Sequence, residues 1–183
     1  MTIDIPTTQQ TSNSAKQIIN WFQDFFKADQ TFELNRFLQE NITADFFKEI
    51  GVWSEEKYLR IKLFANEHCE VIMLCWAKDQ IAPKHNHDKQ DCYVHSIDGY
   101  FEEKRYDCDD CEQIISTHKL NPGDVTQMID TDNYHSLENK TGKPAKSLHF
   151  YAKPINKCDV YCKDTNQFIQ RTLTYDCCIS DFI

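Results

Sequence analysis

From residue 53 onward, short apolar or alternating runs are separated by turn residues, and this rhythm constrains the fold more than any other feature of the chain. The runs are residues 58–64, 69–77, 92–97, 100–106, 112–120, 124–129, 145–152, 159–163 and 167–175. Many short strands at such spacing favour an antiparallel sandwich or barrel. We therefore predict a mainly β domain, with a small β-barrel over residues 53–183.

The residues ahead of this β region show helical spacing instead. Residues 14–27 bring five apolar side chains to one helix face: Ile18, Ile19, Phe22, Phe25 and Phe26. Thr31 can cap a second helix, and Thr43 can cap a third that ends at Gly51. We predict about three short α-helices over residues 14–51.

Length and composition indicate one folded domain. A chain of 183 residues has room for a single sizeable core, and hydrophobic residues at 40% are enough to fill it. The polar opening, residues 1–13, is predicted to be a flexible tail, so the domain spans residues 14–183. This opening lacks the basic and apolar regions of a secretory signal, and an odd number of cysteines fits a reducing compartment, so we expect a cytoplasmic protein.

The charge of the chain disfavours two classes of partner. Nucleic acids and anionic membranes select for clustered Lys and Arg, whereas this chain has a formal net charge of −9. Its longest apolar runs are also too short to span a bilayer. We expect no nucleic-acid partner, no membrane partner and a monomer.

Two histidines one residue apart raise the question of a metal. They lie in "KHNHDKQDCYVHSIDG", residues 84–99. In a strand-like stretch His85 and His87 project from the same face and can share one ion, although neighbouring histidines are often simply surface residues. A third ligand must come from another segment, where His135 and His149 lie in predicted strands. The histidines without a paired context are His68, His95 and His118.

The spacing around these histidines resembles the two cupin motifs. The first motif continues from His85 and His87 to Cys92 and Gly99, and the second is formed by His135 with Asn139. The resemblance implies a small β-barrel with a metal in its mouth. In most cupins a glutamate ligand occupies the position of Cys92. Three neutral imidazoles instead leave the charge of a divalent ion unneutralised, which favours an anionic ligand such as a thiolate. The chain departs from the motifs at Lys78, Asp79, Asp130 and Asp132.

Several further stretches together resemble cysteine dioxygenase. They are "YLR" at 58–60, "CW" at 75–76, "HNHDKQDC" at 85–92, "YHSLEN" at 134–139 and "SLHFYAKP" at 147–154. The resemblance implies that iron(II) is the cofactor and that its ligands are His85, His87 and His135. It also implies that Arg60 and Tyr58 hold the carboxylate of cysteine. A guanidinium suits this role because it pairs bidentately with a carboxylate and stays charged when buried, although an isolated arginine is more often solvated.

The resemblance also assigns roles to a second group of residues. Cys92 and Tyr151 match a pair that is joined by a thioether bond in animal members of the family. The cross-link would fix Tyr151 so that its hydroxyl faces substrate and oxygen, whereas a small buried thiol is the simpler explanation of Cys92. Ser147, His149 and Tyr151 alternate along one predicted strand, which suits a hydrogen-bonded chain from hydroxyl to imidazole to phenol. Cys158 matches a cysteine near the pocket entrance.

The reaction implied by the resemblance is oxidation of L-cysteine by O2 to L-cysteine sulfinic acid, in cysteine catabolism towards taurine and sulfate. Two alternatives stay open. One is a dioxygenase of another small thiol, such as 3-mercaptopropionate or cysteamine, and the other is a non-enzymatic metal-binding cupin. The remaining cysteines could be taken for a structural zinc site, but no compact module brings their pairs together, so we expect free thiols. They include Cys108, Cys111, Cys162, Cys177 and Cys178.

Overall fold

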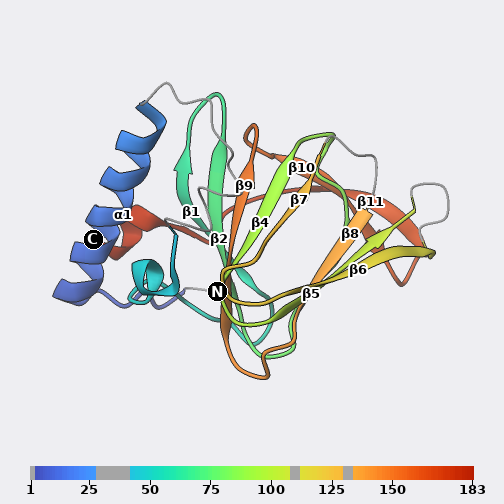
Figure 1. Ribbon diagram of the computed structural model, residues 1–183, viewed down its shortest axis with the longest axis horizontal. Coiled ribbons are helices and arrows are strands. Elements are labelled where there is room, and N and C mark those ends of the chain that lie inside the picture. Colours follow the sequence, from blue (N-terminus) through green and yellow to red (C-terminus); the bar gives the residue numbers. More distant parts are fainter. Residues whose placement is uncertain (1–2, 28–41, 108–111, 130–133) are drawn as a thin grey trace.

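The computed structural model describes residues 3–27, 42–107, 112–129 and 134–183. In this part of the chain, two six-stranded sheets face each other, and one α-helix packs beside the first sheet (Figure 1). The predicted mainly β architecture is therefore confirmed. No helix among the described residues has the length and apolar character needed to cross a membrane.

The first sheet, here called sheet A, has the strand order β12-β1-β2-β9-β4-β7. Its strands are β12 (Cys177–Cys178), β1 (Leu59–Ala65), β2 (Glu70–Trp76), β9 (Ala145–Tyr151), β4 (Cys92–Asp98) and β7 (Val125–Met128). Neighbouring strands are antiparallel except β1 and β12, which are parallel. The two central strands, β2 and β9, are almost fully buried, as expected for strands covered on both faces.

The second sheet, sheet B, has the strand order β11-β10-β3-β8-β5-β6 and is antiparallel throughout. Its strands are β11 (Gln167–Thr172), β10 (Lys157–Cys162), β3 (Ile81–His85), β8 (Tyr134–Asn139), β5 (Phe101–Tyr106) and β6 (Ile114–Leu120). Apolar side chains from both sheets meet in the interior, among them the fully buried Trp76, Phe101 and Leu137. They fill part of the space between the sheets, so the polar site described below has a packed floor.

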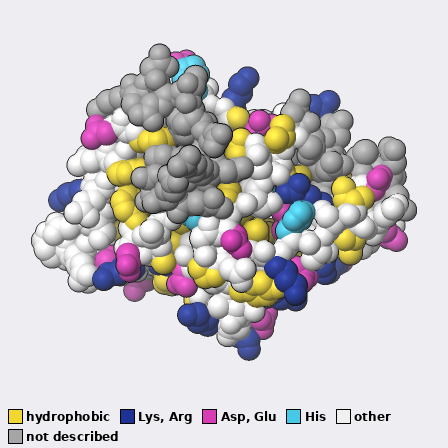
Figure 2. All heavy atoms as spheres, viewed as in Figure 1, with side chains coloured by type: hydrophobic (Ala, Val, Ile, Leu, Met, Phe, Trp, Pro, Cys, Tyr) yellow, Lys and Arg dark blue, Asp and Glu magenta, His cyan; other side chains and the backbone are white. Residues whose placement is uncertain are grey.

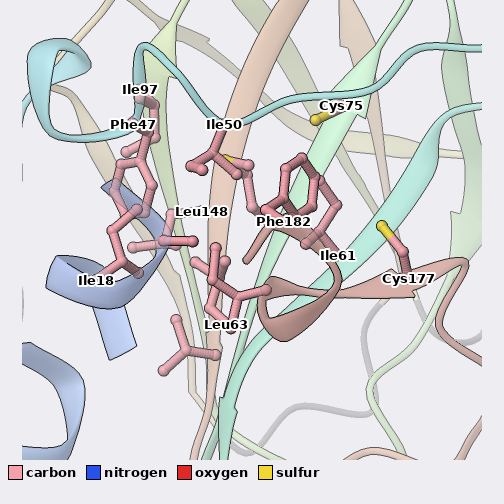
Figure 3. Packing of buried hydrophobic residues seen from close by; sticks show 14 of the residues in the cluster. Ile18, Phe47, Ile50, Ile61, Leu63, Cys75, Ile97, Leu148, Cys177 and Phe182 are labelled. Atoms are coloured by element: carbon pink, nitrogen blue, oxygen red, sulfur yellow. The ribbon is translucent and has the colours of Figure 1, made fainter. Parts of the chain in front are cut away.

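The helix α1 (Gln9–Lys27) closes the other face of sheet A. Its buried Ile18 and Phe22 pack with strand residues and with Phe182 of the short 3-10 helix η2 (Ile179–Phe182) (Figure 3). Burying each such side chain contributes about 1.5 to 3 kcal/mol, so the amphipathic pattern of α1 accounts for its position. This apolar layer supports the back of the sheet A strands β1 and β9, which carry Arg60, His149 and Tyr151 of the candidate site.

The prediction of about three α-helices is wrong, because α1 is the only α-helix among the described residues. The helix predicted from Thr31 lies outside the described residues. After Thr43 the chain forms only a 3-10 turn, η1 (Ala44–Phe47), without a side-chain cap. The carbonyl of Phe47 accepts the backbone N–H of Ile50, at 3.1 Å, in the i+3 to i pattern of a 3-10 turn, and it also accepts a hydrogen bond from the ammonium group of Lys146 on β9, at 2.8 Å.

The helix α1 also begins earlier than the sequence pattern indicates. It starts at Gln9, inside the segment that the sequence predicts to be a flexible tail. The hydroxyl of Thr8 accepts a hydrogen bond from the backbone N–H of Thr11, at 3.1 Å, and so caps the first turn. The apolar spacing marks the buried face of the helix, whereas this polar cap determines where the helix begins.

The surface carries charges of both signs. Figure 2 shows acidic and basic side chains interspersed over the described part of one face. With a net charge of −9, such a surface offers little attraction to a polyanion.

Candidate metal centre

Three histidines converge in the mouth of the barrel. One ring nitrogen from each of His85, His87 and His135 lies within 4.8 Å of the other two. His85 is the last residue of β3, and its backbone pairs with that of His135 on the neighbouring strand β8. Among the described residues, this is the only group of three or more His, Cys, Asp or Glu side chains close enough to share one ion.

The prediction that His85 and His87 share a strand face is corrected by this geometry. The strand β3 ends at His85, and His87 lies in the following turn, where its carbonyl accepts the N–H of Gln90 at 3.1 Å. Asp88 and Lys89 have left-handed backbone conformations, with φ of 53° and 62°. The turn rather than strand alternation therefore brings the two rings together, with their centroids 5.2 Å apart.

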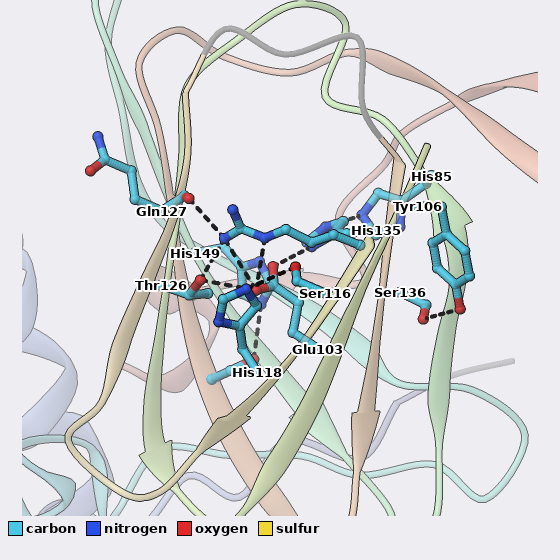
Figure 4. A network of polar contacts seen from close by, with 12 residues as sticks. His85, Glu103, Tyr106, Ser116, His118, Thr126, Gln127, His135, Ser136 and His149 are labelled. Carbon is cyan, nitrogen blue, oxygen red and sulfur yellow. Dashed lines mark hydrogen bonds and ion pairs between the residues drawn. The ribbon is translucent and has the colours of Figure 1, made fainter. Parts of the chain in front are cut away.

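Hydrogen bonds fix which nitrogen faces the centre in two of the three rings, and Figure 4 shows His135 bonded to Glu103. His85 Nδ1 donates to the carbonyl of Pro83, at 2.8 Å, and His135 Nδ1 donates to Glu103, at 2.7 Å. Their Nε2 atoms then carry lone pairs that face each other at 3.2 Å. The Nε2 atom of His87 is buried and has no hydrogen-bond partner among the described residues. Two opposed lone pairs and one orphaned nitrogen fit a shared cation.

The electrostatics favour the neutral imidazoles that metals bind. Burial, together with neighbouring His135, lowers the pKa of His85 to about 3. Burial lowers the pKa of His87 well below its ordinary value, and its two histidine neighbours add to the effect. These two rings are therefore unprotonated at neutral pH, so their nitrogens are free to act as ligands.

Glu103 belongs to this centre and was missed by the sequence analysis. It is fully buried on β5, and its carboxylate accepts hydrogen bonds from His135, Arg105 and Thr126. Burial alone raises the pKa of Glu103, but these partners outweigh burial and lower the pKa to about 2. The alternation of Phe101, Glu103 and Arg105 in the strand was the available signal, because it places both charges on the face that carries a buried phenylalanine.

A small pocket opens beside the histidines. Arg60, Tyr58 and Cys158 line it together with His85, His87, His149 and Tyr151. It holds about 60 Å³ of space for water-sized molecules, where one water needs about 10 to 15 Å³. The pocket therefore suits a ligand of only a few heavy atoms.

The guanidinium of Arg60 has donors to offer in this pocket. Its Nε and Nη2 atoms are buried and have no hydrogen-bond partner among the described residues. Tyr58 precedes β1 rather than sharing a strand face with Arg60, but its ring packs on Trp76, with centroids 4.6 Å apart, and still lines the pocket. Burial raises the pKa of Tyr58 although Arg60 opposes the shift, so the phenol keeps its proton.

Cys92 and Tyr151 lie directly opposite each other on the antiparallel strands β4 and β9. Both side chains are buried. Burial raises the pKa of the Cys92 thiol, and burial together with that thiol raises the pKa of Tyr151. The ring of Tyr151 also lies 5.7 Å from that of His87, measured between centroids. Thiol, phenol and metal-binding ring are therefore adjacent.

The predicted chain from Ser147 to Tyr151 is found only in part. Ser147 Oγ lies 2.9 Å from His149 Nε2, within hydrogen-bond distance. Among the described side chains no hydrogen bond joins His149 to Tyr151, whose rings are nearly parallel with centroids 6.4 Å apart. The chain extends instead to Trp76, whose Nε1–H donates to Ser147 at 2.9 Å. His149 is thus anchored to the core.

The cysteines show no sign of a second metal centre in the described part of the chain. Cys108 and Cys111 lie outside the described residues. Cys158 is buried in the pocket wall, and Cys177 is buried in the apolar layer beneath α1. The described free cysteines are Cys69, Cys75, Cys92, Cys158, Cys162, Cys177 and Cys178.

Comparison with known structures supports the fold. A protein of Thermus thermophilus, TT1209, is 19% identical, has a TM-score of 0.50, and the match covers 58% of this chain and 93% of that protein. A Klebsiella pneumoniae protein with a double-stranded β-helix domain is 13% identical, also has a TM-score of 0.50, and the match covers 73% of this chain and 98% of that protein. The two facing sheets are therefore those of a cupin-like double-stranded β-helix.

Comparison with known sequences identifies the family. "Cysteine dioxygenase type 1" of Rattus norvegicus is 25% identical over 115 residues, which cover 60% of this chain and 58% of that protein. The mouse protein of the same name, from Mus musculus, gives the same values, so the chain spans less than two thirds of these curated relatives. The sequence model of "Cysteine dioxygenase type I" matches residues 5–164. The chain belongs to the cysteine dioxygenase type I family.

Proposed function

We propose that this protein is an iron(II)-dependent thiol dioxygenase that oxidises L-cysteine with O2 to L-cysteine sulfinic acid. The observation that carries the proposal is a cluster of three converging histidines, two of which, His85 and His87, line a small pocket together with Arg60, whose buried Nε and Nη2 atoms have no partner among the described residues. The histidines are suited to binding a metal, and the neighbouring Arg60 donors are suited to binding an anion. L-Cysteine offers a thiolate for the metal and a carboxylate for Arg60.

Arg60 is the proposed carboxylate clamp. A buried donor without a partner costs about 1 to 3 kcal/mol, and a carboxylate satisfies two such donors at once. The protonated hydroxyl of Tyr58 can add a third hydrogen bond to the same group. Carboxylate binding is therefore favoured both by charge attraction and by giving the buried Arg60 donors hydrogen-bond partners.

The three histidines are the proposed iron ligands. Iron(II), when bound, would supply a coordination site for the thiolate and the electrons that activate O2. Because all three ligands are neutral imidazoles, the charge of the ion is left to attract the thiolate. In the overall reaction the sulfur gains both atoms of one O2 and supplies the electrons that reduce it, so no further reductant is consumed.

Tyr151 is the proposed hydrogen-bond donor beside the reacting sulfur. Its raised pKa keeps the phenol protonated at neutral pH, so it acts as a hydrogen-bond donor to the developing oxygen charge. Cys92 on the facing strand holds the ring in place, by contact and by the thioether bond that its position allows. His149, anchored through Ser147 to Trp76, forms the wall behind it.

The choice of thiol is tested by oxygen uptake with three substrates in parallel. We expect L-cysteine to be oxidised best. 3-Mercaptopropionate also carries a carboxylate for Arg60 and is the strongest alternative. Cysteamine lacks a carboxylate and would leave the Arg60 donors buried and unpaired, so it should be poor. Turnover of cysteamine with the kcat/KM of L-cysteine would contradict the proposed clamp.

The proposed compartment follows from the thiols. Cysteines that are free in the described part of the chain are stable where glutathione and thioredoxin keep thiols reduced. We therefore propose a cytoplasmic location.

The cross-link between Cys92 and Tyr151 makes its own prediction. Intact-mass measurement after turnover should show a species about 2 Da lighter than the sequence mass, because a thioether forms with loss of two hydrogens. Cys92→Ser should abolish this species and lower kcat several-fold without removing activity, since the ring loses its tether but keeps its place in the core. Cys158→Ser, which alters another buried cysteine that lines the pocket with Tyr151, is the matched control and should retain the deficit. A deficit that persists in Cys92→Ser would exclude this pair.

A further inference from the structure

The buried carboxylate of Glu103 divides its two oxygens between two tasks. Its Oε1 accepts the hydrogen bond from His135 Nδ1, at 2.7 Å. Its Oε2 accepts from Arg105 Nε and Nη2, at 3.3 and 3.2 Å, and from the hydroxyl of Thr126, at 2.9 Å. One oxygen thus faces a candidate metal ligand, and the other is held by a cation and a hydroxyl.

Arg105 also joins the two sheets at this point. It lies on β5 of sheet B, but its Nη2 donates to Thr126 Oγ1, at 2.7 Å, and to the carbonyl of Gln127, at 2.8 Å. Both acceptors belong to β7, the edge strand of sheet A. Figure 4 shows these contacts running from β7 across to Glu103 and on to His135. The network therefore connects the Glu103 carboxylate, on sheet B, to the edge strand β7 of sheet A.

We propose that Glu103 and Arg105 are positioning residues with opposite effects on the metal. The negative charge of Glu103 orients His135 and makes its ligand nitrogen a stronger donor. Arg105 and Thr126 withdraw part of that charge and so moderate the donation. The inference rests on the proposed function, because it takes His135 to be a metal ligand.

If removing Glu103 and removing Arg105 have opposite effects on bound iron, the pair does more than support the fold. A buried ion pair that only supported the fold would weaken the site in the same way whichever partner was removed. If the pair controls electron donation, removing Glu103 makes bound iron harder to oxidise. Removing Arg105 leaves a less compensated carboxylate and makes bound iron easier to oxidise.

The test uses Glu103→Gln and Arg105→Met, with Arg171→Met on the exposed strand β11 as the matched control. Iron(II) affinity is measured without oxygen against a competing chelator, and the midpoint potential of bound iron is measured by redox titration without substrate. We expect Glu103→Gln to lower the affinity by about 10- to 100-fold and to shift the potential to more positive values. Arg105→Met should shift it to more negative values, and Arg171→Met should leave both quantities unchanged.

Thr126→Val provides a second variant that removes one donor to Glu103 without changing side-chain size. It should shift the potential in the same direction as Arg105→Met, by less, and it keeps the test valid if a charge variant does not fold. Shifts of one common direction, or none in folded protein, would overturn the inference. Wild-type protein that binds iron but oxidises no thiol would overturn the proposed function alone, because neither readout requires turnover.

Discussion

Replacing His87 by alanine should abolish iron binding and turnover. His87 supplies one of only three nitrogens at the centre, and its Nε2 atom has no other partner in the described structure. Two imidazoles from His85 and His135 cannot hold a labile divalent ion at micromolar concentrations as well as three do. Iron is quantified per chain after loading under nitrogen and dialysis. We expect less than about one tenth of wild-type occupancy, which corresponds to a loss of at least about 1.4 kcal/mol in binding free energy.

The control for this variant is His118→Ala. His118 is exposed on β6 and bonds only to neighbouring Ser116 among the described residues, so its loss should leave iron content and turnover at wild-type levels. Circular dichroism on both variants establishes that they are folded. Full iron occupancy in folded His87→Ala would remove His87 from the ligand set.

The second large effect is expected at Arg60. Arg60→Ala removes two charge-assisted hydrogen bonds to the substrate carboxylate, each of about 1.5 to 3 kcal/mol, so the KM for L-cysteine should rise about 100-fold or more. Arg60→Lys keeps the charge but loses the planar guanidinium, so its KM for L-cysteine should lie between those of wild-type protein and Arg60→Ala. Steady-state oxygen uptake over a range of L-cysteine concentrations measures the effect.

Two control measurements on Arg60→Ala test whether the effect arises from the lost carboxylate contact. The kcat/KM for cysteamine, which has no carboxylate, should not fall in Arg60→Ala. The thermal midpoint of ligand-free protein should be equal or higher, because the variant no longer buries unpaired donors. An unchanged KM for L-cysteine would show that the carboxylate binds elsewhere.

Much of this fold could be predicted from the sequence, because the period of two in hydrophobicity survives wherever one strand face is buried. Residues 58–64 contain β1 almost entirely and residues 100–106 contain β5, and burial alternates along most of both strands. The number of helices was harder to predict from the sequence. Thr43 and the apolar residues after it carry the local signals of a helix, but the chain forms only a 3-10 turn there, and the distant Lys146 donates to the carbonyl of Phe47 in that turn. Local propensity could not reveal that contact.

The candidate site shows the same difference between local signals and long-range contacts. The spacing of His85, His87 and His135 identified the histidines that the structure brings together. The alternation of Glu103 with Phe101 indicated a buried position, but its contact with His135 depends on the pairing of β5 with β8, which local spacing does not reveal. The bond from Trp76 to Ser147 was missed for the same reason, since β2 and β9 meet only in the folded sheet. Such supporting contacts are long-range, whereas ligand spacing is local.

The central proposal is tested most directly by the mass of the product formed by iron-loaded protein from L-cysteine and O2 labelled with the heavy oxygen isotope. The proposal predicts L-cysteine sulfinic acid that carries both heavy atoms, formed in step with the oxygen consumed. Oxygen consumption that yields only cystine, or a sulfinate with one heavy atom, would contradict the proposed dioxygenase reaction.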